Sequence, residues 1–376
     1  MTTFFIICLL IQPWLFVPIK GIINQFRMPQ GVFLNFIFLG MIFFMFFSGI
    51  KNFYRNKYLA VFIAYLFLMI FATLFIPIVF QKPVNNYLIY PSICVILTVF
   101  ASYIALSYFD KEDYIRIAKA LCLSGTLIAS FGLLQFIGFD PLRSIAHYNC
   151  VNRLSACLDN PNLVGNYLAI IAPLFLYFKS RKYLIGYLLS LLCVLATKSH
   201  IAYVCFVVGS LLTLFLQYKH IKNVRVIVMS LGLSGLVWLY FNQWMLKMDS
   251  LLDGRLYCWQ IVIDLIKKSP LFGLGLGVFS MLRIETVGTG GVGNAIWFEA
   301  HCDPLQYILE IGLVGVLLAG FVIVNALRNF SFKERIGLSY FSMFVTFLLC
   351  SCVSFPIEVP SLAVLGLIGF WATERL

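Results

Sequence analysis

An arginine at the start of a helical stretch is the first candidate for chemistry. The side chains of residues 256–268 separate at helical spacing into an apolar face, which includes Trp259, and a polar face. Arg255 precedes Trp259 by four residues and therefore shares the apolar face. A guanidinium on an apolar surface is costly unless it meets an anion. We expect Arg255 either to pair with a carboxylate, Asp253 or Glu299, or to bind an anionic substrate.

A histidine lies at the start of the next apolar stretch, in Glu299-Ala-His301-Cys-Asp303. The unperturbed pKa of imidazole, about 6.5, suits proton removal near neutral pH. His301 is therefore a candidate general base, and Glu299 or Asp303 is available to hold its ring. The alternative is a structural hydrogen bond at the start of the helix.

A second arginine comes shortly before another predicted helix. The sequence Asn160-Pro-Asn162 is typical of a turn followed by an N-capped helix, which leaves Arg153 without a structural explanation. Cys150 and Cys157 lie on either side of Arg153. They could form a disulfide if this side of the protein is oxidising.

Glycines follow the first candidate helix. Gly273-Leu-Gly275-Leu-Gly277 lacks the strand and helix that a dinucleotide-binding loop needs, so we expect these glycines to allow tight backbone turns. Residues 286–294 are also rich in glycine and show no periodicity. They are either a mobile loop over a site or disordered filler.

The composition shows what kind of protein must position these residues. Of the 376 residues, 62% are hydrophobic and 11% are charged, whereas a soluble domain has roughly 25% charged residues. This excludes a soluble enzyme and predicts a polytopic membrane protein. The net charge of +12 fits Lys and Arg in cytoplasmic loops better than nucleic-acid binding.

The apolar runs predict an all-α bundle of about twelve transmembrane helices that forms one membrane domain, residues 1–376. The first run has no basic n-region or signal-peptidase site, so we interpret it as a retained helix. The twelve runs are 4–19, 32–50, 58–80, 87–108, 117–139, 162–178, 183–197, 201–217, 224–241, 304–327, 336–355 and 359–372.

Lysine and arginine counts orient this bundle. With both termini cytoplasmic, sixteen of the 27 basic residues lie in inner loops and the C-terminal tail. Four lie in short outer loops: Lys20, Arg27, Lys82 and Lys198. Two outer, periplasmic excursions remain, 140–161 and 242–303. They contain the candidate residues, so we expect function on that side.

Three motifs in order resemble the bacterial O-antigen ligase and polymerase superfamily, integral membrane glycosyltransferases of the outer face of the inner membrane. The first motif is Arg153-Leu-Ser-Ala-Cys-Leu-Asp-Asn-Pro-Asn162. The second combines Gly254-Arg255, Trp259 and Pro270-Leu-Phe-Gly-Leu-Gly-Leu-Gly277, and the third combines Ala300-His301, Leu305-Gln306 and Glu310-Ile-Gly312-Leu-Val-Gly315. The resemblance covers roughly residues 150–325.

The chain departs from the superfamily pattern at three places. Cys302 stands where Asn usually follows the histidine, and Ser199-His200 replaces a Ser-Arg pair. Ala156 replaces a glycine before the Asn-Pro-Asn turn. These changes leave the arginine and histidine assignments in place, and they do not assign the chain to one branch of the superfamily.

The resemblance implies transfer of a glycan from undecaprenyl diphosphate to an acceptor hydroxyl, with no cofactor. Arg153 and Arg255 would stabilise the diphosphate leaving group, and His301 would act on the acceptor hydroxyl. Asn162, Glu299 and Asp303 complete the predicted substrate-binding set. We find no Asp-x-Asp or His/carboxylate cluster at ligand spacing in either excursion, so we favour a metal-independent mechanism.

The acceptor defines the alternatives. An O-antigen ligase, which uses lipid A core, is favoured weakly over a polymerase, which joins repeat units. A lipid-linked glycan transporter is a lower alternative, because transporters place charged residues deep in their spans and the interiors of these runs carry almost none.

Overall fold

The computed structural model describes residues 1–16, 27–47, 108–142, 153–218, 255–282, 284–286, 295–328, 330–331 and 333–376, with a few positions between 61 and 106. This part is helical apart from two strands of three residues each. Four helices are long and apolar enough to cross a membrane: α5 (Lys111–Phe136), α8 (His200–Tyr218), α13 (Asp303–Arg328) and α14 (Arg335–Val353).

Further apolar helices complete the bundle. They are α1 (Thr2–Ile11) with the turn η1 (Gln12–Trp14), α2 (Arg27–Phe47), α6 (Pro161–Tyr177), α7 (Arg181–Ala196) and α15 (Pro360–Arg375). The helical membrane class is thus confirmed. The predicted spans 58–80, 87–108 and 224–241 lie largely or wholly outside the described residues, so the number twelve stays a prediction.

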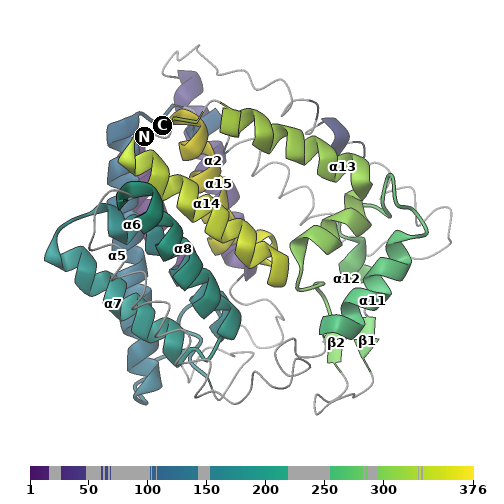
Figure 1. Cartoon of the computed structure of the whole chain (residues 1–376), viewed down its shortest axis with the longest axis horizontal. Coiled ribbons are helices and arrows are strands. Elements are labelled where there is room, and N and C mark those ends of the chain that lie inside the picture. Colours follow the sequence, from purple (N-terminus) through teal and green to yellow (C-terminus); the bar gives the residue numbers. More distant parts are fainter. Residues whose placement is uncertain are drawn as a thin grey trace.

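Helix α6 forms the centre of the bundle. It packs against α5, α7, α8 and α14 (Figure 1). Almost all of its side chains are buried. Small residues allow its neighbours to approach closely, as is usual between membrane helices. A Cβ on Gly165 of α6 would lie 2.5 Å from the Cβ of Ala202 of α8.

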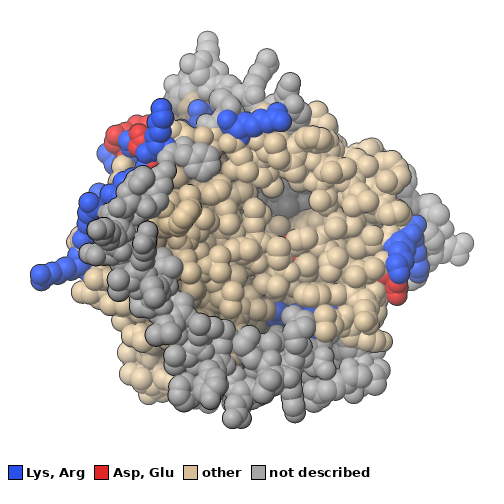
Figure 2. Space-filling model, viewed as in Figure 1, with Lys and Arg blue, Asp and Glu red and all other residues tan. Residues whose placement is uncertain are grey.

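The outer helices expose apolar stripes. Large side chains on α2, α7 and α13 recur at helical spacing, so each stripe faces away from the bundle, as lipid contact requires. Figure 2 shows a face that is mostly uncharged, with Lys and Arg gathered towards its margins. The stripes are Val32, Phe36, Leu39 and Phe43, then Leu184, Leu188 and Leu192, and finally Leu313, Leu317, Phe321 and Val324.

The predicted inner residues gather at one end of the bundle. Thr2 Oγ1 donates to Asp113 Oδ1 (2.7 Å), and Lys111 Nζ lies 2.7 Å from Glu334 Oε2. The two chain ends lie close together there (Figure 1). If the spans alternate as predicted, all inner residues must lie at one end of the bundle, as they do here. The candidate site residues lie at the opposite end.

Helix α13 is broken, although the sequence predicted a continuous span over 304–327. Gly312 has a φ of 68°, and a loop from the preceding excursion pairs with the backbone around it. Leu274 N donates to Leu309 O (2.8 Å), and Leu313 N donates to Pro270 O (2.9 Å). The loop therefore satisfies the polar groups that the break would otherwise leave unpaired, which apolar surroundings demand.

The long excursion has its own small fold. Its amphipathic helix, predicted over 256–268, is α11 (Arg255–Ile266), which packs on α13. A short helix, α12 (Val278–Leu282), follows the loop, and then β1 (Ile284–Thr286) pairs antiparallel with β2 (Ala295–Trp297). The sequence did not predict this strand pair.

Candidate active site

The turn that carries His301 is fixed from two sides. Trp259 Nε1 of α11 donates to Ala300 O (2.8 Å), and Ala300 N donates to Gln306 Oε1 of α13 (3.0 Å). His301 itself has a φ of 53°, in the left-handed region that histidine adopts more readily than most residues. Helices α11 and α13, through Trp259 of the second motif and Gln306 of the third, thus determine the position of the imidazole.

The His301 ring lies between two aromatic rings. The centroid of Trp297 is 5.1 Å away and that of Phe355 is 4.6 Å away, both in edge-to-face orientation. Its Nδ1 atom is buried and has no hydrogen-bond partner within the described residues. Burial, together with the positive charges of Arg255 and Arg27, lowers the pKa of His301 to about 3. The imidazole is therefore neutral and has a nitrogen available.

Arg255 lies on the buried face of α11, as the helical spacing predicted. It is 5% exposed and shares that face with Cys258 and Val262. Its Nη1 donates to the carbonyl oxygen of Val353 at the end of α14 (2.8 Å). A neutral carbonyl positions the guanidinium without cancelling its charge, and that charge acts on His301.

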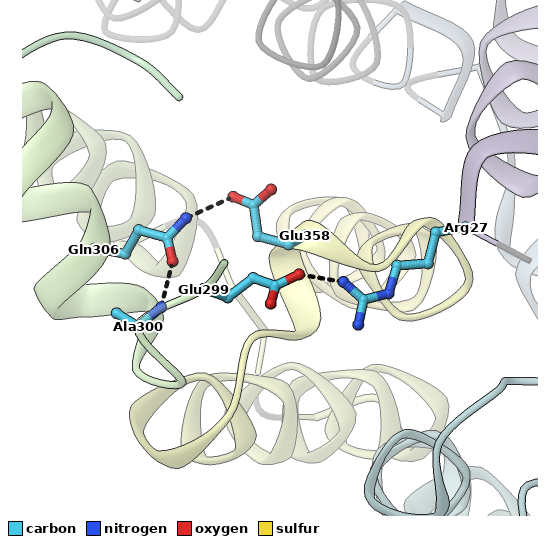
Figure 3. A network of polar contacts seen from close by, with 5 residues as sticks. All are labelled: Arg27, Glu299, Ala300, Gln306 and Glu358. Carbon is cyan, nitrogen blue, oxygen red and sulfur yellow. Dashed lines mark hydrogen bonds and ion pairs between the residues drawn. The ribbon is translucent and has the colours of Figure 1, made fainter. Parts of the chain in front are cut away.

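Glu299, one expected partner of Arg255 and of the His301 ring, instead pairs with Arg27 (Figure 3). Arg27 is the first residue of α2, and its guanidinium lies 4.9 Å from the centroid of the Phe355 ring. Sequence reasoning had placed Arg27 in a short outer loop and missed it as a site residue. The available signal was a cation on the side of the membrane where cations are rare.

Further carboxylates surround this group without touching the imidazole. Glu358, in the turn η4 (Pro356–Glu358), accepts hydrogen bonds from Tyr307 Oη (2.9 Å) and Gln306 Nε2 (3.5 Å). Burial raises its pKa. Asp303 is 1% exposed and accepts from Ile357 N (3.2 Å). Within the described residues, neither Glu299 nor Asp303 hydrogen-bonds the His301 ring.

Figure 3 shows Glu299 and Glu358 near each other between Gln306 and Arg27. The space-filling view is hollowed near its centre, and acidic atoms are visible within the hollow (Figure 2). The group therefore combines two guanidinium ions, two partly accessible carboxylates and a neutral imidazole. Such a group can bind an anion and accept a proton from a hydroxyl.

Glu310 of the third motif has a structural role. Its carboxylate accepts hydrogen bonds from Gly277 N (2.9 Å) and Phe279 N (3.3 Å), and so holds the start of α12. It ties the second motif to the third. The glycine-rich residues 286–294 were expected to form either a mobile loop or filler. Thr286 instead ends strand β1, and residues 287–294 lie outside the described residues.

Arg153 forms a second group at the same end of the bundle. Its Nε and Nη2 donate to Thr197 O (2.8 and 2.5 Å), and Nη2 also donates to Asn162 Oδ1 (3.4 Å). The predicted N-cap is confirmed, because Asn162 N donates to Asn160 Oδ1 (2.9 Å). Arg153 therefore spans the end of α7 and the start of α6.

The two groups are connected through the central helix. Asn166 lies one turn after Asn162 on α6, and its Nδ2 donates to Ser354 Oγ (3.0 Å), next to the carbonyl of Val353 that binds Arg255.

Ala156, which replaces the glycine of the superfamily, has a φ of 43°, a conformation that favours glycine. Cys157 is a buried free thiol, and Cys150 lies outside the described residues.

Comparison with known proteins agrees with these motifs. A family profile, Wzy_C, described as O-Antigen ligase, matches residues 185–320. The exopolysaccharide production protein ExoQ of Rhizobium meliloti (strain 1021) is 32% identical over 82 residues, which cover 21% of this chain and 19% of that relative. The match thus spans about a fifth of the relative's length. No solved structure matches this chain. The resemblance that the motifs indicated is confirmed.

Proposed function

We propose that this chain, which carries an O-antigen ligase type segment, transfers a glycan from undecaprenyl diphosphate to an acceptor hydroxyl on the outer face of the bacterial inner membrane. One observation carries the proposal. The guanidinium groups of Arg27 and Arg255 lie against residues 353–355 at the end of α14, where the His301 ring contacts the Phe355 ring. Arg255 and His301 belong to the segment that matches the family profile. A site for an anionic leaving group beside a proton acceptor is what glycan transfer from a diphosphate needs.

The bonds in the proposed step balance as follows. The bond between the sugar's anomeric carbon and the diphosphate oxygen breaks, and undecaprenyl diphosphate leaves with both electrons. The acceptor oxygen bonds to the anomeric carbon, and its proton passes to His301. Arg255 and Arg153 stabilise the growing negative charge, because a guanidinium binds phosphate oxygens in pairs.

The low pKa of His301 fits a base that becomes effective when the donor is bound. Positive charges from Arg255 and Arg27 disfavour protonation in the empty site. A diphosphate placed near these guanidinium groups offsets their charge and raises the pKa of the imidazole. Proton removal is thereby linked to the presence of a leaving group.

The remaining predicted residues divide into two kinds. Asn162 positions Arg153, and the buried Asp303 supports the turn at Ile357, so both act through other residues. Glu299 is partly accessible at the group around His301 and is placed to meet a substrate. We propose that no metal takes part, because neither excursion contains Asp-x-Asp.

The acceptor separates two versions of this function. We favour an O-antigen ligase that uses lipid A core, which agrees with the description of the family profile. Polymerisation of repeat units is the second candidate, and the match to a protein named for exopolysaccharide production favours it. Transport of a lipid-linked glycan is a lower alternative, since the polar groups gather at the end of the bundle and transporters bind near the midplane.

Purified protein in nanodiscs tests this function. It is given an undecaprenyl-diphosphate oligosaccharide in excess chelator, either alone or with lipid A core, and products are identified by mass spectrometry. Product only with core supports a ligase, and longer chains without core support a polymerase. No product in either case would overturn transferase activity, and rescue by a divalent ion would overturn metal independence.

A further inference from the structure

Two arginines from distant parts of the sequence flank the same short segment at the end of α14. Arg255 donates to the carbonyl of Val353, and the Arg27 guanidinium lies over the ring of Phe355, two residues later. The His301 ring contacts the edge of that same Phe355 ring. The positive charges of Arg27 and Arg255 both act on the imidazole, so the two guanidinium groups share one electrostatic environment.

Arg153, the other arginine predicted from the sequence, is bound elsewhere. Its guanidinium is held by the carbonyl of Thr197 and by Asn162. A diphosphate has two phosphate groups, and each can accept a pair of hydrogen bonds from one guanidinium. In the structure Arg27, rather than Arg153, lies against the same segment of α14 as Arg255.

Glu299, the partner of Arg27, lies where a ligand anion could replace it. The side chains of Arg27 and Glu299 are 17% and 20% exposed, so an incoming anion can reach the pair. Arg27 Nε has no hydrogen-bond partner within the described residues, which leaves donor capacity beyond its bond to Glu299. A phosphate that displaces the carboxylate replaces one anion with another, so the guanidinium is never left buried and unpaired.

We propose that Arg27 is the second phosphate-binding guanidinium of the site, and that Glu299 occupies it until the lipid carrier binds. The inference rests on the proposed function, because it takes the ligand to be a polyprenyl diphosphate. Arg27 and Arg255 each hold one phosphate, and Arg153, bound to Thr197 and Asn162, adds positive charge from the neighbouring group. The N-terminus of α2 thereby becomes part of the donor site.

Binding of undecaprenyl diphosphate and undecaprenyl monophosphate to nanodisc-embedded protein tests the assignment. The wild type should bind the diphosphate more tightly. Arg27→Gln should weaken diphosphate binding about tenfold or more and change monophosphate binding little, because one charge-assisted contact is lost. Glu299→Gln should bind the diphosphate at least as tightly as the wild type, and a tenfold loss there would overturn the placeholder role.

A double variant separates binding from simple charge balance. Arg27→Gln alone leaves the Glu299 carboxylate unpaired, and that carboxylate could repel the diphosphate without any contact between Arg27 and phosphate. Arg27→Gln combined with Glu299→Gln removes this repulsion. The double variant should bind as weakly as Arg27→Gln, and recovery of wild-type affinity would refute a phosphate contact.

The controls keep the two proposals distinguishable. Arg116→Gln removes an exposed cation at the opposite end of the bundle and should leave binding unchanged. Failure of the wild type to bind undecaprenyl diphosphate would overturn the proposed function itself. Wild-type binding that survives in the double variant would overturn only the role of Arg27.

Discussion

The backbones of Gly273 and Gly312 lie directly against each other. A Cβ on either glycine would lie 2.6 Å from the backbone nitrogen of the other. Both residues also have positive φ, at 72° and 68°. The contact joins the loop after α11 to the break in α13, and it brings the second and third motifs together.

Gly312→Ala should destabilise the protein by several kcal/mol, because the new methyl group meets backbone atoms and the φ is unfavourable. The measurement is the thermal unfolding midpoint in detergent. Gly320→Ala is the matched control, since it lies in the same helix with no atom within 4 Å of a new Cβ. Equal midpoints for the two variants would contradict the close packing described here.

Arg255→Lys should lower transfer about 100-fold while the protein still inserts and accumulates, because the charge remains and the two-pronged geometry is lost. Arg153→Lys should also lose most activity. Arg116→Lys, at an exposed position on α5, should retain wild-type rates. Near-full transfer by both site variants would make these arginines structural.

Removal of His301 should block transfer and leave carrier binding largely intact, because the imidazole meets only the acceptor hydroxyl in the proposed step. His301→Asn and His301→Gly suit this test better than His301→Ala, since Asn and Gly tolerate the φ of 53°. Carrier binding and product formation are measured on the same samples. Wild-type transfer rates in His301→Asn would refute the catalytic role.

The low pKa of His301 predicts an acid-sensitive fold. Burial and the charges of Arg255 and Arg27 lower this pKa to about 3, whereas the unfolded imidazole titrates near 6.5. Between these values the unfolded state binds more protons, so this contribution to stability is lost as the pH falls from about 6.5 towards 3.

The measurement for this pH effect is the difference in unfolding midpoint between wild type and His301→Asn. The wild-type midpoint should fall more steeply on acidification than that of the variant. Glu299, Glu358 and Asp303 remain in both proteins, so their protonation largely cancels in the difference. Parallel curves from pH 7.5 to 4.5 would show that the folded imidazole is not held neutral.

Single cysteines test the predicted topology in a cysteine-depleted background. Lys267→Cys should label from outside intact cells, because this exposed side chain belongs to the excursion that is predicted to be periplasmic. Lys333→Cys, exposed at the opposite end, should label only after permeabilisation. Equal accessibility of both positions would reject the orientation derived from Lys and Arg counts.

The sequence predicted most of the described helices because each carries a long apolar run. The runs 162–178 and 336–355 correspond to α6 and α14 within two residues, and 117–139 corresponds to α5, which begins six residues earlier. Helical spacing also placed Arg255 on a buried face, since a 3.6-residue period depends only on local positions. Local patterns were thus sufficient for these features.

Features that depend on distant contacts were missed. The break in α13 requires a loop some forty residues earlier in the chain, so 304–327 resembled one uninterrupted span. The pairing of Arg27 with Glu299 joins positions 272 residues apart. No periodicity links such residues, and only the folded bundle brings α2 next to the turn before α13.

The central position of α6 affects how deep the site lies. Its 17 residues extend about 26 Å, whereas a bilayer core is about 30 Å thick. Because other helices surround α6, it does not contact lipid along its length and need not match that thickness. The predicted topology puts its inner end at the cytoplasmic surface, so we expect its outer end, where Asn162 meets Arg153, to lie a few ångström below the lipid headgroups. Phosphates attached to a lipid can reach this depth from within the leaflet, whereas a water-soluble sugar phosphate would have to leave bulk solvent. We therefore expect the immersion of the site to discriminate between donors before any sugar is recognised.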